Sequence, residues 1–194
     1  MASLMLLIPL LGIIILNFTF KVTMRRVAFW FALILFTLQL LILVLQNNVF
    51  SGMPERGFCS LFTFNLATDG LTFLMLLCIE IACLSSLIVA RYTLTDINQR
   101  FNFINLLIIA SIGMNGIVMT RDIFSLYIFL EVAAVSSFIL IAFRRGSRAL
   151  EGAFKYIMLS AVATIFMLSA IALLLLASEG TGFVQLRQAI LAHA

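Results

Sequence analysis

Charged residues are scarce in this chain. Lys, Arg, Asp and Glu together make up 10% of the 194 residues, whereas they make up about 25% of an ordinary soluble domain. The lack of charge therefore argues against a soluble protein. Hydrophobic residues make up 64% of the sequence, and this excess indicates an integral membrane protein.

Cysteine and histidine are too few for a metal or redox centre. The three cysteines, Cys59, Cys78 and Cys83, do not have the spacing of metal ligands, and there is a single histidine. Cys78 and Cys83 lie in an apolar segment, where a thiol packs like a small hydrophobic side chain. We therefore expect no metal ion, no iron–sulfur cluster and no other cofactor. The basic residues lie in loops rather than in a stripe, which argues against nucleic acid as a partner.

Six apolar segments are long enough to cross ~30 Å of hydrocarbon as helices. They are residues 3–20, 27–45, 71–90, 103–120, 122–143 and 153–177. They predict an all-α fold, a polytopic membrane helix bundle with about six transmembrane helices, in a single domain over residues 1–194. Residues 46–70 are rich in turn-forming residues and are predicted to be irregular, and residues 178–194 are predicted to form an amphipathic tail on the membrane surface.

Basic residues gather in the loops that follow the first, third and fifth segments. These loops, with the residues next to them, contain Lys21, Arg25, Arg26, Arg91, Arg100, Arg144, Arg145 and Arg148. The opposite side has only Arg56, Arg121 and Arg187. The positive-inside rule therefore places the first set in the cytoplasm and predicts that both termini lie outside it.

A carboxylate in the middle of an apolar segment is the main indication of function. Glu131 lies within residues 122–143, about 13 Å along a helix from Asp122. An ionised side chain at the bilayer centre costs about 2.5–3.5 kcal/mol on insertion scales, so such a residue usually faces a protein partner, a water-filled cavity or an ion path. We expect Glu131 to exchange protons. A neutral glutamic acid that forms only an interhelical hydrogen bond is the alternative.

Two further ionisable residues lie within the segments. Glu80 is at the centre of residues 71–90, where a proton relay and an interhelical or subunit contact are both compatible with its position. Lys155 lies roughly one turn inside residues 153–177, and the alternative to a proton-transfer role is an ammonium group that reaches the membrane surface. Glu131 is about 18 Å along its helix from residue 143, so water or a third group would have to connect it to Lys155.

Small and polar residues cluster in residues 103–120 and in the segment that contains Glu131, residues 122–143. Gly113 and Gly116 lie beside Ser111 and Asn115 in residues 103–120. Such residues let membrane helices approach closely, and packing is the preferred interpretation over a hydration site. A second small face surrounds Glu131 and contains Ala133, Ala134, Ser136 and Ser137.

These features resemble the antiporter-like proton-conducting membrane subunits of respiratory complex I, Mrp-type cation/proton antiporters and energy-converting membrane-bound hydrogenases. The resemblance covers about residues 65–183 and includes TDGLTFLMLL at residues 68–77, the Asp-Ile-Phe start at Asp122 and the aromatic-rich turn into Glu131. It also includes the Leu-Glu-x-x-x-Lys-Tyr opening that contains Lys155. The chain looks most similar to the N-terminal portion of the N-type complex I subunit or the D-type Mrp subunit.

The resemblance implies roles for four residues. In this family, the glutamate matched by Glu131 belongs to an ion pair that couples proton movement to a distant redox or exchange event. Lys155 matches a frequent lysine of the sixth helix, and Asp122 lies at the outer end of the implied pathway. Glu80 is outside the family pattern and is a further candidate for proton transfer.

The resemblance also implies partners and a location. It predicts a non-catalytic subunit of an ion-translocating oxidoreductase or antiporter complex in a prokaryotic cytoplasmic membrane. The expected partners are other membrane subunits, lipids and protons, and sodium is the alternative ion. Full members have about fourteen helices, including a broken seventh helix with a lysine, so we expect another chain to supply the missing antiporter-like helices. The alternatives are a structural or assembly subunit without a transport role and, less favoured because the polar groups are dispersed, a membrane enzyme or quinone-binding protein.

Overall fold

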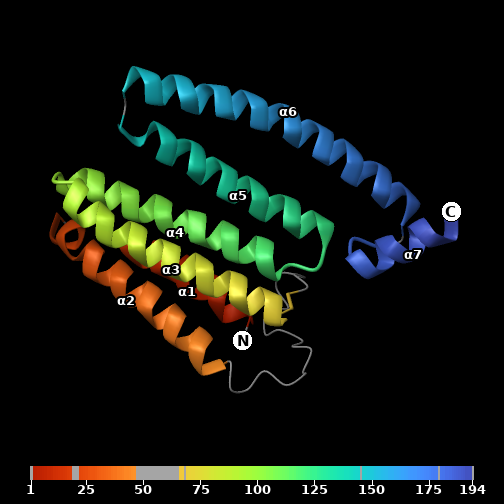
Figure 1. Cartoon of the computed structure of the whole chain (residues 1–194), viewed down its shortest axis with the longest axis horizontal. Coiled ribbons are helices and arrows are strands. Elements are labelled where there is room, and N and C mark those ends of the chain that lie inside the picture. The colour runs from red at the N-terminus through yellow and green to blue at the C-terminus, as the bar shows by residue number, and fades with distance from the viewer. Residues whose placement is uncertain are drawn as a thin grey trace.

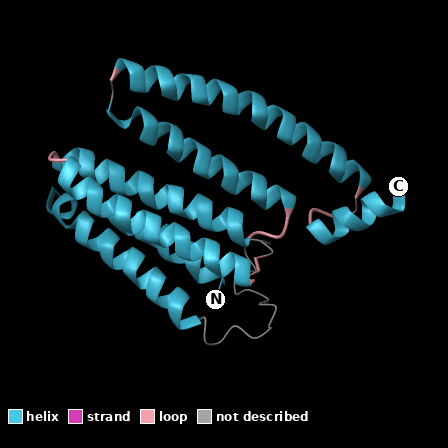
Figure 2. Cartoon of the chain, viewed as in Figure 1, coloured by secondary structure: helices cyan, strands magenta, loops and turns pink. Residues whose placement is uncertain are grey.

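The computed structural model describes residues 2–18, 22–46, 66–67, 69–144, 146–178 and 180–193. These residues form helices joined by short loops, with no β-strand among them (Figure 2). The helices are α1 (Ala2–Phe18), α2 (Val22–Gln46), α3 (Gly70–Thr93), α4 (Ile97–Met119), α5 (Ile123–Ile141), the short 3-10 turn η1 (Ala142–Arg144), α6 (Ser147–Ala177) and α7 (Phe183–His193). The predicted all-α class is confirmed.

Five of the described helices are long and apolar enough to cross a membrane. Their apolar spans are Val27–Leu45, Gly70–Thr93, Ile97–Met119, Ile123–Ile141 and Ser147–Leu176. Helix α1 has a shorter apolar stretch, Leu4–Phe18, close to the lower limit of about 17 residues for a spanning helix.

Three helices begin well before the ranges read from the apolar pattern. Helix α2 begins at Val22 rather than 27, α4 at Ile97 rather than 103, and α6 at Ser147 rather than 153. In each case polar and charged residues continue the helix beyond the apolar stretch, such as Arg25 in α2, Arg100 in α4 and Glu151 in α6. Hydropathy marks the part of a helix that prefers lipid, whereas backbone hydrogen bonds and caps determine where the helix ends.

Polar side chains form hydrogen bonds with the unpaired backbone groups at the ends of the central helices. Asp96 and Asp122 are the N-caps of α4 and α5, and each accepts a hydrogen bond from a backbone N–H of the first turn. At the C-terminus of α3, Arg100 Nη2 donates to the carbonyl oxygens of Arg91 and Leu94. These carbonyls have no partner within their own helix, so the guanidinium group stabilises the turn between α3 and α4.

The helices are arranged in order outward from a compact group. Helices α2, α3 and α4 contact one another pairwise, and α1 packs against α2 and α4. Helix α5 packs on α4, and α6 lies outermost, against α5 (Figure 1). The C-terminal ends of α1, α3 and α5 lie at one end of the bundle, and the N and C labels of the chain lie toward the other (Figure 1). The side of the membrane that each end faces remains a prediction.

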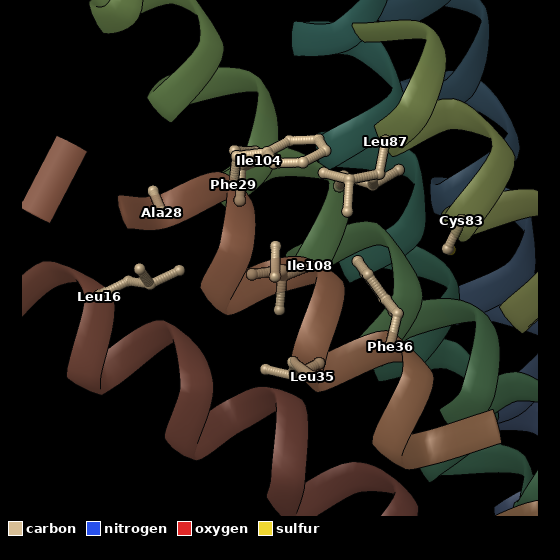
Figure 3. Packing of buried hydrophobic residues seen from close by; sticks show 11 residues of the cluster. Leu16, Ala28, Phe29, Leu35, Phe36, Cys83, Leu87, Ile104 and Ile108 are labelled. Carbon is tan, nitrogen blue, oxygen red and sulfur yellow. The ribbon is translucent and has the colours of Figure 1, made fainter. Parts of the chain in front are cut away.

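Two apolar clusters fill the space between α1, α2, α3 and α4. The first contains Leu16, Ala28, Phe29, Ala32, Leu35, Phe36, Cys83, Leu87, Ile104, Leu107 and Ile108 (Figure 3). The second contains Met5, Leu43, Leu76 and Met119. Each cluster takes side chains from all four helices, so together they hold α1–α4 as one unit against which α5 packs.

The C-terminal helix is attached at the α4–α5 connection. The backbone N–H of Ile123 donates to Thr181, and that of Phe183 donates to Arg121. In α7, Leu186 is buried while Val184 and Leu191 are exposed. The placement of this tail on a membrane surface remains a prediction.

Part of the sequence interpretation falls outside the described residues. The irregular loop predicted at 46–70 does so except at its ends, as do Lys21, Arg56, Cys59 and Arg145.

Candidate functional site

Glu131 lies in the middle of α5 and is partly buried. Thr164 of α6 donates its hydroxyl hydrogen to Glu131 Oε1 at 2.6 Å. No ion pair to Glu131 is present in the described part of the chain. A carboxylate at mid-helix depth is therefore held between two helices by a neutral group. Sequence reasoning missed Thr164, although Ser160 and Thr164 are polar residues one turn apart on an otherwise apolar helix.

Close packing of α4 on α5 sets the position of this carboxylate. A Cβ atom added at Gly113 would lie 2.7 Å from the backbone nitrogen of Ala133, and one at Gly116 would overlap the ring of Phe129. The absence of side chains at both glycines lets the helices approach closely, as the small residues in the sequence predict. Glu131 lies between these two contacts along α5.

Lys155 is not brought to Glu131. Its ammonium group pairs with Glu151 one turn earlier on α6, and the two side chains are 72% and 63% exposed. Lys155 precedes Thr164 by nine residues, which is about 13 Å along the helix. A direct pair between Glu131 and Lys155 is absent, in agreement with the helix-length argument.

Glu80 is completely buried in α3, on the far side of α4 from Glu131. Asn115 of α4 donates to Glu80 Oε1 at 3.3 Å. The contact is an interhelical hydrogen bond, one of the two roles that the sequence left open for Glu80. Asn115 lies between Gly113 and Gly116 in the sequence, so Glu80 and Glu131 have similar depths on opposite sides of α4.

Asp122 is buried where α4 turns into α5. Its Oδ1 atom accepts a hydrogen bond from the backbone N–H of Ser125 at 2.7 Å, while Oδ2 has no partner in the described region. Asp122 therefore caps the helix that carries Glu131. Its predicted place at the outer end of a proton path is a separate proposal.

Replacement of Asp122 distinguishes the cap from an acid–base role. We expect Asp122→Ala to lower the unfolding free energy by about 0.5–2 kcal/mol, whereas Asp122→Asn keeps the capping oxygen and most of the stability. Unfolding of the purified protein in detergent, followed by circular dichroism, measures the difference. Equal losses in the two variants would contradict the capping role.

A polar groove opens at the end of the bundle that contains the α3–α4 turn. It runs along α4 and reaches α5 and α6, with Thr93, Leu94, Asp96, Asn98, Gln99, Asn102, Asn105, Leu106, Ile139, Ala142, Phe143 and Leu150 as its lining residues. Ile139 is eight residues from Glu131 on α5, a separation of about 12 Å. On α5 the groove therefore ends about 12 Å short of Glu131.

Residues that could form a metal centre are not grouped in the described ranges. No set of three or more His, Cys, Asp and Glu side chains there could hold a metal ion. The buried polar groups of these helices are carboxylates, which can bind and release protons, and amides and hydroxyls, which donate and accept hydrogen bonds.

The apolar helices define an integral membrane protein with carboxylates at mid-helix depth. Residues 120–194 match the family model described as NADH:quinone oxidoreductase/Mrp antiporter, transmembrane. The matched range includes Asp122, Glu131, Lys155 and Thr164, but not Glu80. The predicted resemblance is confirmed: residues 120–194 are similar to the membrane part of NADH:quinone oxidoreductases and Mrp antiporters.

Curated relatives carry the same two kinds of name. The chain is 32% identical over 134 residues to NADH-quinone oxidoreductase subunit N of Parvibaculum lavamentivorans, covering 69% of this chain and 26% of the relative. It is 25% identical over 170 residues to the D-type subunit of the Na(+)/H(+) antiporter of Alkalihalophilus pseudofirmus, covering 86% and 34%. The chain thus spans about a quarter to a third of the length of these relatives.

Two solved structures share the fold. A chain of the membrane-bound sulfane sulfur reductase, an archaeal respiratory membrane complex, superposes with a TM-score of 0.81 at 24% identity, over 95% of this chain and 39% of that one. A chain of respiratory complex I from Thermus thermophilus gives 0.73 at 23% identity, over 94% and 38%. These similarities establish the helix arrangement.

Proposed function

We propose that the chain is a membrane subunit of a multisubunit cation-translocating complex, in which Glu131 binds and releases the translocated proton. The observation that carries this proposal is the mid-helix carboxylate of Glu131, hydrogen-bonded by Thr164 and without an ion pair among the described residues. The names of the relatives, an NADH-quinone oxidoreductase subunit and a Na(+)/H(+) antiporter subunit, support the class.

The hydrogen bond from Thr164 suits a carboxylate that changes its protonation state. A hydroxyl group can donate to an ionised carboxylate, and after rotation it can accept from a protonated one. Thr164 therefore keeps Glu131 in place in both states. When a cation of a neighbouring subunit approaches, the ionised form of Glu131 is favoured and the proton leaves; when the cation withdraws, a proton binds again.

Two ionisable residues lie on either side of Glu131 along the bundle. Asp122 precedes Glu131 by nine residues on α5, and Lys155 precedes Thr164, the partner of Glu131, by nine residues on α6. Each separation is about 13 Å along the helix. We assign Lys155 to the end with the polar groove and Asp122 to the opposite, outer end of the proton path. Proton transfer over these separations requires intervening water, for which the groove provides an opening at the Lys155 end.

The outer surface of the bundle is suited to lipids and to further subunits. Helix α6 packs on α5 and α7 in the described structure, and large apolar side chains such as Leu159, Phe166 and Leu173 are exposed on it. We infer that other membrane subunits and lipids cover this surface. We also infer a prokaryotic cytoplasmic membrane, and the arginine-rich loops support an orientation with both termini outside the cytoplasm.

Ion translocation by sealed vesicles tests the proposal. Vesicles that contain the intact complex are compared for wild type and Glu131→Gln at equal subunit content, with proton and sodium uptake measured separately. Loss of uptake with assembly preserved would support a place on the ion path. Unchanged uptake would indicate that the chain is a structural or assembly subunit.

Replacement of Thr164 tests its positioning role in the same assay. Thr164→Val keeps the shape but removes the hydroxyl group, and we expect the translocation rate to fall by about threefold to tenfold, the equivalent of roughly 0.6–1.4 kcal/mol. Thr164→Ser keeps the hydroxyl group and should retain most of the rate. An equal loss in both variants would point to packing rather than to the hydrogen bond.

A further inference from the structure

Three polar side chains form a buried layer between α2, α3 and α4. Gln39, Glu80 and Asn115 are each 0% exposed. Along its own helix, each of the three lies between a residue of the first apolar cluster and a residue of the second. Gln39 lies between Phe36 and Leu43 on α2, Glu80 between Cys83 and Leu76 on α3, and Asn115 between Ile108 and Met119 on α4. Since the three helices contact one another pairwise, the polar residues share one depth at the boundary of the two clusters.

The hydrogen bonds in this layer leave three oxygen atoms without a donor. Asn115 Nδ2 donates to Glu80 Oε1 at 3.3 Å, and Gln39 Nε2 donates to the carbonyl of Met5 on α1 at 3.1 Å. Gln39 Oε1, Glu80 Oε2 and Asn115 Oδ1 are buried and have no partner in the described structure. Buried polar groups are nearly always hydrogen-bonded, and each unsatisfied group costs about 1–3 kcal/mol.

A single proton on Glu80 would satisfy two of these three oxygen atoms, Oε2 itself and one amide acceptor. On Glu80 Oε2 it would convert one unsatisfied acceptor into a donor, and the unsatisfied amide oxygens of Gln39 and Asn115 belong to the two helices that pack against α3. The described ion pairs, Asp69 with Arg121 and Glu151 with Lys155, do not involve Glu80. An ionised Glu80 would therefore be a buried charge without a counter-charge, whereas the protonated side chain is neutral.

We propose that Gln39, Glu80 and Asn115 form a proton-binding site separate from Glu131. Glu80 carries the proton on Oε2 and donates it to the amide oxygen of Gln39 or Asn115. The bound proton joins α3 to a neighbouring helix by a second hydrogen bond. Two cysteines share the helix of Glu80: Cys83 is buried in the first apolar cluster, and Cys78 is exposed. The site does not depend on the role proposed for Glu131.

Infrared spectroscopy tests the site directly. The intact protein, with carbon-13 in its glutamate carboxyl groups, is reconstituted in lipid at neutral pH, with and without sodium. We expect a carbonyl-stretch band of a protonated carboxylic acid that is lost in Glu80→Gln and retained in Glu131→Gln. Absence of such a difference, with Glu80 contributing only carboxylate bands, would overturn the proposal. A band that appears only after removal of sodium would also overturn it, because the occupant would then be a sodium ion.

Amide variants on α4 locate the acid within the layer and do not require Glu80 to be altered. Asn115→Leu removes the donor to Glu80 Oε1, so the carbonyl stretch should shift to higher frequency. Asn105→Leu is the matched control, since Asn105 lies on the same helix and its side chain bonds to Asn17 instead; the band should not move. If Asn115→Leu leaves the band in place, the acid that gives rise to it is not Glu80.

Discussion

The rate of ion translocation is expected to be at least about tenfold lower in vesicles that contain the Glu131→Gln protein than in wild-type vesicles. This difference is equivalent to ~1.4 kcal/mol in activation free energy. The substitution keeps the size of the side chain and its acceptor oxygen for Thr164, but glutamine cannot bind and release a proton in the relevant pH range. Loss of rate would therefore report on proton exchange rather than on packing. A quench assay with an imposed proton or sodium gradient measures it.

A matched neutralisation at another carboxylate controls for the change in charge. Asp69 is exposed, pairs with Arg121 and does not line the polar groove. Asp69→Asn removes one negative charge at the surface, so translocation should stay within about twofold of wild type, or ~0.4 kcal/mol. Equal losses in Glu131→Gln and Asp69→Asn would contradict a specific role for Glu131.

Gly113→Ala is expected to destabilise the folded protein by about 1–3 kcal/mol, the usual cost of overpacking a tight contact. The added methyl group would lie 2.7 Å from the backbone nitrogen and 2.9 Å from the Cα atom of Ala133. Because backbone atoms cannot turn aside as a flexible side chain can, α4 and α5 must separate. The separation would also displace Glu131, which lies two residues before Ala133. Thermal unfolding in lipid or detergent measures the loss.

Gly152→Ala is expected to have the opposite effect on the stability of the folded protein. Gly152 is in α6, and nothing lies within 4 Å of an added Cβ atom. Alanine is favoured over glycine within a helix by about 1 kcal/mol, so this variant should be as stable as wild type or more stable. If Gly113→Ala is as stable as Gly152→Ala, the two helices do not pack as closely as described.

The two mid-membrane carboxylates differ in their surroundings more than in their depth. Glu131 is partly buried between α5 and α6, within the range matched by the family model. Glu80 is fully buried between α3 and α4, outside that range. Partial burial is compatible with proton exchange, whereas enclosure by two apolar clusters favours retention of a proton. This difference in burial underlies the two roles that we propose, proton exchange at Glu131 and proton retention at Glu80.

The sequence by itself determined the class of protein and the helices. Low charge and long apolar runs leave little alternative to a membrane helix bundle, because lipid requires every backbone group to be bonded within its own helix. The residues that surround Glu131 and Lys155 were also sufficient to indicate the antiporter-like family. The apolar pattern places the starts of α2, α4 and α6 too far inside these helices, since hydropathy does not register the polar turns with which they begin.

Only the tertiary structure decided which side chains meet. Thr164 was not singled out beside Glu131, and nothing in the local sequence distinguishes Gln39 from an ordinary polar residue in an apolar run. Lys155 pairs with Glu151 on its own helix rather than with a residue of α5. Contacts between residues such as Glu80 and Asn115, 35 positions apart, depend on the rotation and relative depth of packed helices. Those quantities follow from close approach at positions such as Gly113, and a pattern along one helix does not contain them.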